Sequence, residues 1–165
     1  MYHKEEVRNL LQEEGVSYRW VDHEAAYTIE DMERMGIDAD AAVAKNLFLR
    51  DQKGKKHYLV VLCADKQVNL RSFGETFDLG KLSFASEERL MKYLGLTKGS
   101  VTPFGILNDI NCEVRVFIDK DLEFVDELGV HPNDNCASVF LSMKDLISIL
   151  SKFGNDISFV EIPNQ

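Results

Sequence analysis

The chain lacks the features that would place it in a special structural class. Its 165 residues include three prolines and ten glycines, too few for a collagen-like or low-complexity chain. The longest uninterrupted apolar run, residues 58–64, has seven residues, whereas a membrane-spanning helix needs about 20. No apolar stretch follows the charged residues 1–6, so we expect neither a membrane segment nor a secretory signal.

Cysteine is scarce as well. Cys63, Cys112 and Cys136 are odd in number and widely spaced, and no two of them form a C-x-x-C pair. This usage is typical of a reducing compartment rather than of a disulfide framework, and it predicts a cytoplasmic protein. Cys63 lies within the apolar run, so we interpret it as a small core residue rather than as a nucleophile.

The sequence also lacks the common motifs of nucleotide and hydrolase chemistry. It contains no P-loop, no G-x-G-x-x-G, no H-E-x-x-H and no G-x-S-x-G. Its four histidines, His3, His23, His57 and His131, have no metal-ligand spacing with one another or with the cysteines. We therefore expect no metal and no cofactor.

Acidic residues outnumber basic residues, but the basic residues are unevenly distributed along the chain. The net charge of −9 argues against a protein that coats nucleic acid. Residues 44–100, however, carry eleven Lys/Arg and six Asp/Glu, whereas the rest of the chain carries eight and twenty-two. A basic segment in an acidic body could hold a phosphate-bearing ligand, although chance scatter of surface charge would give the same pattern.

Hydrophobic periodicity and turn residues predict a single α/β domain over residues 1–165. Capping residues and glycines mark the ends of the expected helices, which span 4–14, 28–36, 86–94 and 143–153. Shorter helical segments or turns are expected at 38–43 and 68–73. Alternating or apolar runs predict strands at 17–23, 45–50, 57–63, 114–118, 122–125, 136–141 and 157–162. We expect these strands to form a mixed, mostly antiparallel sheet of about six or seven strands, surrounded by helices.

Three features could carry chemistry, and each also has a purely structural interpretation. Lys45 opens an apolar strand, where it could point into a cavity or extend into solvent. The loop 99–105 has a glycine at each end and an internal proline, so its backbone N–H groups could face an anion or simply connect two elements. His131 precedes a proline, which favours an extended backbone, but a lone histidine is more often structural.

Together these features resemble a known family. Lys45-Asn-Leu-Phe-Leu, the G-x-x-x-P loop from Gly99 to Pro103 and Gly129-Val-His-Pro-Asn133 occur in the order found in the YbaK/ProX family. The members are trans-editing aminoacyl-tRNA deacylases related to the insertion domain of bacterial prolyl-tRNA synthetase. The sequence looks most like the ProX (PrdX) branch, which is associated with alanyl-tRNA charged onto the proline tRNA, whereas the YbaK branch acts on the cysteinyl counterpart.

The resemblance implies roles for the matched residues. Lys45 would anchor the terminal phosphate or ribose and stabilise charge near the ester, and Asn46 would orient the substrate. Backbone N–H groups of the loop from Gly99 to Pro103 would hold the carbonyl oxygen. His131 would hydrogen-bond the ribose or the amino acid, and a role as general base is the less favoured alternative. The remaining expected pocket residues are Tyr27, Thr28, Met32, Ser100, Val101, Thr102 and Pro103.

The resemblance also implies the partners. The expected partner is the acceptor end of an aminoacyl-tRNA, with prolyl-tRNA synthetase as a second candidate, and a monomer is favoured. The basic middle segment would contact the tRNA, through Arg50, Lys53, Lys55, Lys56 and Lys66. Two alternatives stay open: a deacylase for cysteinyl-tRNA or another small aminoacyl-tRNA, and a non-catalytic regulator that binds an amino acid or tRNA.

Overall fold

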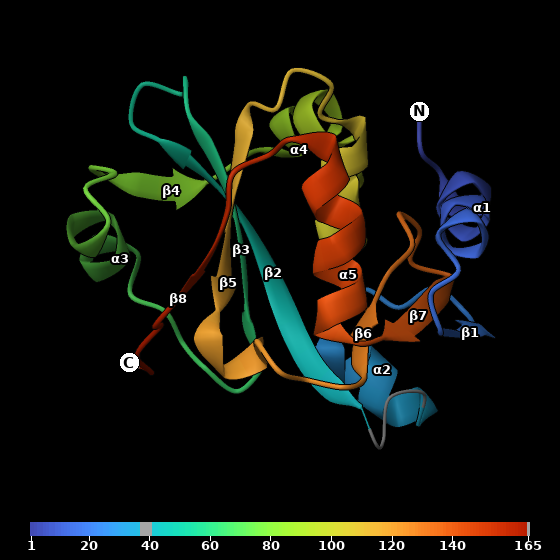
Figure 1. Ribbon diagram of the computed structural model, residues 1–165. Coiled ribbons are helices and arrows are strands. Elements are labelled where there is room, and N and C mark those ends of the chain that lie inside the picture. Colours follow the sequence, from blue (N-terminus) through green and yellow to red (C-terminus); the bar gives the residue numbers. More distant parts are fainter. Residues whose placement is uncertain (37–40, 165) are drawn as a thin grey trace.

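An eight-stranded mixed sheet organises the described part of the chain, residues 1–36 and 41–164 of a computed structural model (Figure 1). The strand order is β1-β7-β6-β2-β3-β5-β8, and β4 pairs separately with β2. Four of the strand pairings are antiparallel and three are parallel. The strands are β1 Arg19–Asp22, β2 Ala42–Asp51, β3 His57–Cys63, β4 Leu82–Phe84, β5 Val114–Asp119, β6 Leu128–Val130, β7 Ala137–Leu141 and β8 Ile157–Val160.

In the part of the chain that the structure describes, five α-helices and three short 3-10 helices surround this sheet. The α-helices are α1 Lys4–Glu14, α2 Ile29–Met35, α3 Leu70–Thr76, α4 Glu87–Leu94 and α5 Met143–Leu150; the 3-10 helices are η1 Pro103–Asn108, η2 Lys120–Leu122 and η3 Ser151–Phe153. In the described residues no helix is both long and apolar enough to cross a bilayer. The predicted α/β class and mixed, mostly antiparallel sheet are confirmed.

Local capping chemistry explains why several helices begin and end where the sequence predicts. The Ser86 side chain accepts a hydrogen bond from the backbone N–H of Arg89 at the start of α4, and Ser142 does the same for Asp145 in α5. Gly15 and Gly95 follow α1 and α4 in the left-handed conformation, which costs glycine little.

The structure differs from the sequence prediction at three strands, one loop and one turn. Residues 122–125 form no strand: the Asp119 carboxylate accepts from the backbone N–H of Asp121 and begins η2, which buries Leu122. The short strands β4 and β6 were not predicted. The second half of the loop 99–105 forms the start of η1. The predicted turn 38–43 lies partly outside the described residues, and its last two residues, Ala42 and Val43, belong to β2.

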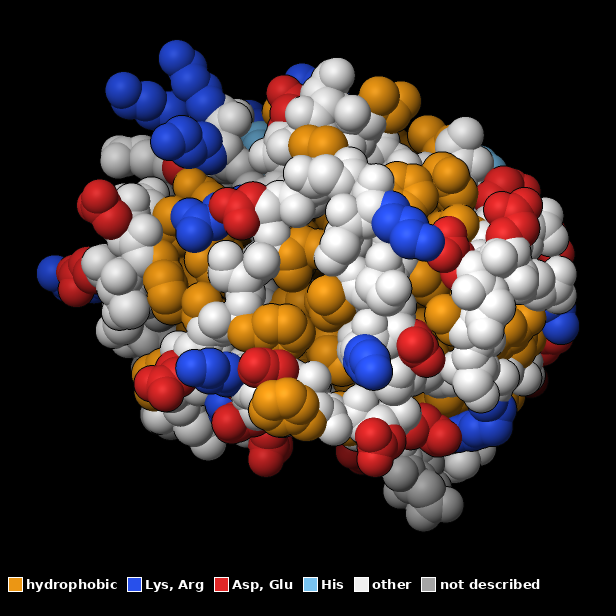
Figure 2. Space-filling model, viewed as in Figure 1, with side chains coloured by type: hydrophobic (Ala, Val, Ile, Leu, Met, Phe, Trp, Pro, Cys, Tyr) orange, Lys and Arg blue, Asp and Glu red, His pale blue; other side chains and the backbone are white. Residues whose placement is uncertain are grey.

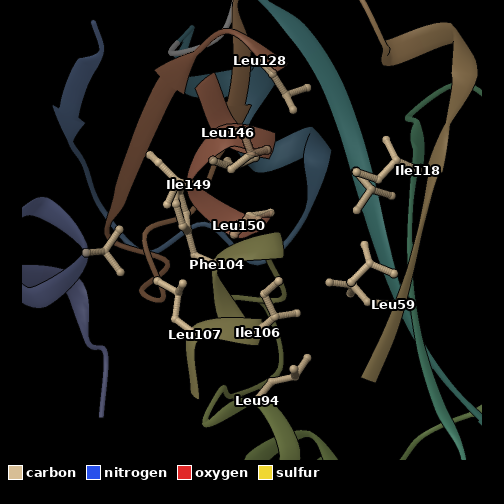
Figure 3. Packing of buried hydrophobic residues seen from close by; sticks show 14 of the residues in the cluster. Leu59, Leu94, Phe104, Ile106, Leu107, Ile118, Leu128, Leu146, Ile149 and Leu150 are labelled. Carbon is tan, nitrogen blue, oxygen red and sulfur yellow. The ribbon is translucent and has the colours of Figure 1, made fainter. Parts of the chain in front are cut away.

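The hydrophobic core has one cluster on each face of the central strands. Strand β3 is buried on both faces, with Leu59 and Val61 in the larger cluster and Val60 and Leu62 in the smaller one. Figure 3 shows Leu59 on the sheet side of the larger cluster, opposite the layer of η1 and α5. The smaller cluster packs under α3. The sheet is therefore rigid at its centre, and its ends are free to form a site.

Candidate active site

A cavity of about 310 Å³ opens beside the paired ends of β2 and β6. It receives side chains from β2, β6 and β7, from the segment before α2, and from the loop after α4. The lining residues are Tyr27, Thr28, Val43, Ala44, Lys45, Asn46, Gly99, Val101, Gly129, Val130, His131 and Ser138. Segments far apart in the sequence thus meet at one place.

The strand register explains how Lys45 and His131 come together. β2 and β6 run parallel, and Val43 is paired with Gly129. Lys45 and His131 each lie two residues beyond that pair. The two strands therefore bring them to the same height along the strand direction, just past the end of β6. The site therefore lies where the carboxyl end of β6 meets the first residues of β2.

Lys45 and Asn46 contribute polar groups that have no partner among the described residues. Within residues 1–36 and 41–164, no carboxylate lies within ion-pair distance of the half-buried Lys45 ammonium. The Oδ1 atom of Asn46 is buried and accepts no hydrogen bond in that same part of the chain. A buried acceptor without a partner is costly, so both groups are suited to binding a ligand.

The hydrogen bonds of His131 determine which ring nitrogen faces the cavity. Nδ1 lies 3.0 Å from the carbonyl oxygen of Ala137, which can only accept, so Nδ1 carries the proton. Burial lowers the pKa of His131 below its usual value, and the nearby ring of His23 lowers it further, against the raising effect of the Ala137 hydrogen bond. At neutral pH the ring is uncharged, and Nε2 is an acceptor.

Gly99 shapes another wall of the cavity. Its φ of +93° favours glycine, and a Cβ at this position would lie 2.7 Å from Cδ1 of Tyr27. The Tyr27 ring therefore packs directly on the glycine backbone. The Thr102 hydroxyl donates to the carbonyl oxygen of His131 at 2.6 Å, which fixes this loop against the histidine segment.

The first turn of α2 holds Tyr27 and Thr28 at the cavity. The Asp31 carboxylate accepts from the backbone N–H groups of both residues, and the Thr28 hydroxyl accepts from Asp31 in return. The hydrogen bond from Tyr27 is the largest cause that lowers the pKa of Asp31, so this carboxylate is charged at neutral pH. Met32 belongs to α2, but its side chain lies outside the described residues.

Three of the residues expected at the pocket do not line the cavity. Ser100, Thr102 and Pro103 are buried. The Ser100 hydroxyl donates to the carbonyl oxygen of Thr97, and Thr102 supports His131 from outside the cavity. These residues lie on the predicted loop, but its path turns their side chains into the protein, and the sequence pattern does not encode that path.

The structure adds five lining residues that the sequence analysis missed: Val43, Ala44, Gly129, Val130 and Ser138. The first four flank Lys45 and His131, so proximity to the motifs was an available signal. Ser138 had none, because its place depends on the pairing of β7 with β1 and β6. Its hydroxyl lies 2.9 Å from Nε2 of His23, and the residue is only 1% exposed.

One group of potential metal ligands lies outside the cavity, but a lysine ammonium already pairs with both of its carboxylates. Cys63, Asp119 and Asp121 bring their ligand atoms within 4.8 Å of one another. The Lys66 ammonium donates to Asp119 at 3.0 Å and to the carbonyl oxygen of Ile162 at 2.8 Å, and it pairs with Asp121 at 2.7 Å. Burial, followed by Asp119, raises the pKa of the Cys63 thiol to about 11. The donor set is therefore poorly suited to a metal.

Comparison with known proteins assigns the site to a family. The profile of the aminoacyl-tRNA editing domain matches residues 23–149, which include every residue that lines the cavity. The chain belongs to the aminoacyl-tRNA editing domain family. This editing domain is therefore an aminoacyl-tRNA deacylase, an enzyme that hydrolyses the ester of a mischarged tRNA.

Individual relatives agree with this assignment. The prolyl-tRNA editing protein ProX of Acetoanaerobium sticklandii is 46% identical over 159 residues, covering 96% of the editing domain and 97% of the relative. A proline–tRNA ligase of Limosilactobacillus fermentum is 27% identical over 113 residues, which are 67% of this chain and 19% of the ligase. The crystal structure of a candidate trans-editing enzyme for prolyl-tRNA synthetase shares the fold, with a TM-score of 0.72, 19% identity, and coverage of 98% of this chain and 97% of that one.

Proposed function

We propose that the editing domain hydrolyses alanyl-tRNA charged onto the proline tRNA, acting in trans on the free aminoacyl-tRNA. The observation that carries this proposal is the meeting of an unpaired ammonium, an unpaired amide oxygen and a neutral imidazole in one small cavity. The ProX relative supports the tRNA identity, since its name describes prolyl-tRNA editing. Prolyl-tRNA synthetase is proposed as a functional partner, because part of a proline–tRNA ligase is related in sequence.

The walls of the cavity favour a small amino acid. Val43, Val101 and Val130 line it together with Ala44, and β-branched side chains have few rotamers with which to make room. A synthetic site cannot strongly reject an amino acid smaller than its own, so fidelity needs a second site that admits the smaller one and excludes the correct one. In this proposal the valines admit an alanyl methyl group and obstruct the larger prolyl ring.

The polar groups divide the remaining tasks. Lys45 stabilises negative charge on the phosphate or near the ester carbonyl, and the backbone at Gly99 holds the carbonyl oxygen as it becomes an oxyanion. Asn46 Oδ1 accepts a hydrogen bond from the amino group of the substrate. His131 Nε2 accepts from a ribose hydroxyl, and the ribose in turn helps activate the attacking water. No covalent acyl-enzyme is needed in this scheme.

A panel of aminoacyl-tRNAs tests the proposal. Purified protein is incubated with alanyl-, cysteinyl- and prolyl-tRNA of the proline type, and loss of the ester is followed over time. We expect hydrolysis of the alanyl ester and sparing of the prolyl ester. Preferential hydrolysis of the cysteinyl ester would move the specificity to that amino acid. Tight binding without hydrolysis of any of the three would identify a regulator instead.

A further inference from the structure

The tip of the β2–β3 hairpin carries a cluster of positive charge away from the catalytic cavity. Figure 2 shows Lys and Arg side chains gathered at the upper left, where Figure 1 places this hairpin. We call this set the hairpin cluster; Arg89 joins it from α4, and its members are Arg50, Lys53, Lys55, Lys56 and Arg89. The three lysines are exposed, and the two arginines are half-buried.

Arg89 is held in place by neutral acceptors. Its Nη1 atom donates to the carbonyl oxygen of Gly54 at 2.9 Å and lies 3.1 Å from Nε2 of His57. His57 is only 1% exposed, and its ring packs against the rings of Phe48 and Tyr93, at centroid distances of 5.6 and 3.9 Å. Burial, then the charge of Arg89, lowers the pKa of His57 to about 4, so at neutral pH its ring accepts a hydrogen bond without adding charge.

Arg50 is fixed in the same way and converges on the same glycine. Its Nε and Nη2 atoms donate to the carbonyl oxygens of Asp51 and Gln52, at 3.1 and 3.0 Å. A Cβ on Gly54 would lie 2.7 Å from Nη2 of Arg89 and 3.1 Å from Nη2 of Arg50. The two guanidinium groups are therefore within about 6 Å of each other.

No carboxylate of residues 1–36 and 41–164 forms an ion pair with these converging charges. The carboxylate of the turn itself, Asp51, accepts instead from the backbone N–H groups of Lys55 and Lys56, at 2.8 and 3.1 Å. Two fixed guanidinium groups with N–H donors to spare are well suited to binding phosphate oxygens.

We propose that the hairpin cluster binds phosphates in the duplex part of the tRNA acceptor arm. The proposal rests on the proposed function, because it takes the ester to lie in the cavity. Asp51 follows Lys45 by six residues along β2, a distance of about 20 Å. A nucleic-acid strand advances about 3.4 Å per nucleotide. The hairpin therefore meets phosphates roughly six nucleotides from the ester, beyond the single-stranded end of the arm.

Lys66 does not belong to this surface, although the sequence analysis placed it there. Its ammonium makes three hydrogen bonds or ion pairs inside the protein. A phosphate would have to displace Asp119, which is fully buried. Arg89, which the sequence analysis did not select, takes its place in the cluster.

Two variants of the cluster and one matched control test the proposal. Lys55→Gln/Lys56→Gln removes two exposed charges, and Arg89→Gln removes one fixed guanidinium. Lys120→Gln/Lys144→Gln removes two exposed charges elsewhere and serves as the control. Thermal melts establish that each variant is folded, and the lysine pair keeps the test valid if Arg89→Gln is unstable.

The first measurement is binding of uncharged proline tRNA over a range of salt concentrations. We expect about tenfold weaker binding for each cluster variant and a log–log salt slope smaller by about one per lost phosphate contact. The control variant should bind like the parent. This measurement needs no hydrolysis, so it stands even if the proposed substrate is wrong. Parent-like affinity and slope in both cluster variants would overturn the proposal.

The second measurement compares full-length alanyl-tRNA with an alanylated CCA trinucleotide. The cluster variants should raise KM for the full-length substrate about tenfold and leave its kcat unchanged. The trinucleotide cannot reach the hairpin, so its hydrolysis should match that of the parent. An equal loss on both substrates would show that the substitutions act on the cavity, and the proposed contact with the duplex would be wrong.

Discussion

At the scale of single residues, Lys45 is the group whose role can be separated most cleanly from stability. It is half-buried on the cavity wall and pairs with no described carboxylate. Lys45→Ala should change the free energy of unfolding by no more than about 0.5 kcal/mol, as at most positions outside the core. Single-turnover deacylation should fall about 100-fold or more, the usual loss when one electrostatic stabiliser is removed.

Two further results decide the interpretation of Lys45. Lys45→Arg should not restore the parent rate, because a planar guanidinium group cannot replace a compact ammonium in a small cavity. Melts of all three proteins serve as the folding control. If Lys45→Ala deacylates at the parent rate, Lys45 has no catalytic role and is only a lysine near the start of β2.

Gly99 tests whether the contact with Tyr27 matters. Gly99→Ala places a methyl group 2.7 Å from the Tyr27 ring, so we expect the ring to shift and deacylation to fall at least tenfold. Gly80→Ala is the matched control, since its φ is also positive but a Cβ there meets nothing within 4 Å. Both variants should lose about 1 kcal/mol or more in the free energy of unfolding from backbone strain. If both also lost activity equally, the Tyr27 contact would have no specific role.

At the scale of elements, the sequence predicts what is encoded locally and misses what depends on pairing. The caps at Ser86 and Ser142 and the helix ends at Gly15 and Gly95 are short-range chemistry. β6 has only three residues, and its position follows from long-range partners in β2 and β7. The predicted strand at 122–125 failed because the Asp119 side chain, not an alternating pattern, determines that turn.

The packing of His57 in β3 against Tyr93 in α4 predicts that acid lowers the stability of the folded protein. The pKa of His57 is about 4 in the folded protein, below its usual value of 6.5. As pH falls, the unfolded chain therefore binds a proton first, and protonation favours unfolding. The contribution of neutral His57 to the free energy of unfolding is fully present above about pH 6.5. It is lost as the pH falls toward 4, by up to about 3 kcal/mol.

His57→Phe is the variant that isolates this effect. Phenylalanine can keep the stacking with Phe48 and Tyr93 but cannot bind a proton. Denaturant unfolding at a series of pH values should show a smaller loss of stability between pH 6.5 and 4 in the variant than in the parent. Parallel curves would mean that other groups, such as the carboxylates, account for the acid sensitivity.

At the scale of the whole molecule, the meeting of the three motifs was predictable, but only part of the cavity wall was. The three motifs around Lys45, Gly99 and His131 lie far apart in the sequence, and the resemblance brought them to one place before any contact was known. The structure joins them around one cavity. Ser138 and the buried orientation of Thr102 could not be inferred, because both depend on how separate segments pack.

The charge of the whole molecule limits how it can hold a tRNA. Outside residues 44–100 the chain carries eight Lys/Arg and twenty-two Asp/Glu, so most of the surface repels a phosphate backbone. The cations that the two proposals bring to the tRNA are Lys45 and the five residues of the hairpin cluster. With a slope of about −0.9 per phosphate on duplex, the log–log salt dependence of tRNA binding should be no steeper than about −6.

Anisotropy titrations of labelled proline tRNA between 50 and about 200 mM salt, the range in which counterion release is readily measured, give this slope directly. A labelled single strand that ends in CCA is the control, and it should give a shallower slope because it does not extend to the hairpin. A tRNA slope equivalent to about eight or more phosphate contacts would contradict binding through one arm. It would require contacts from cations other than these six.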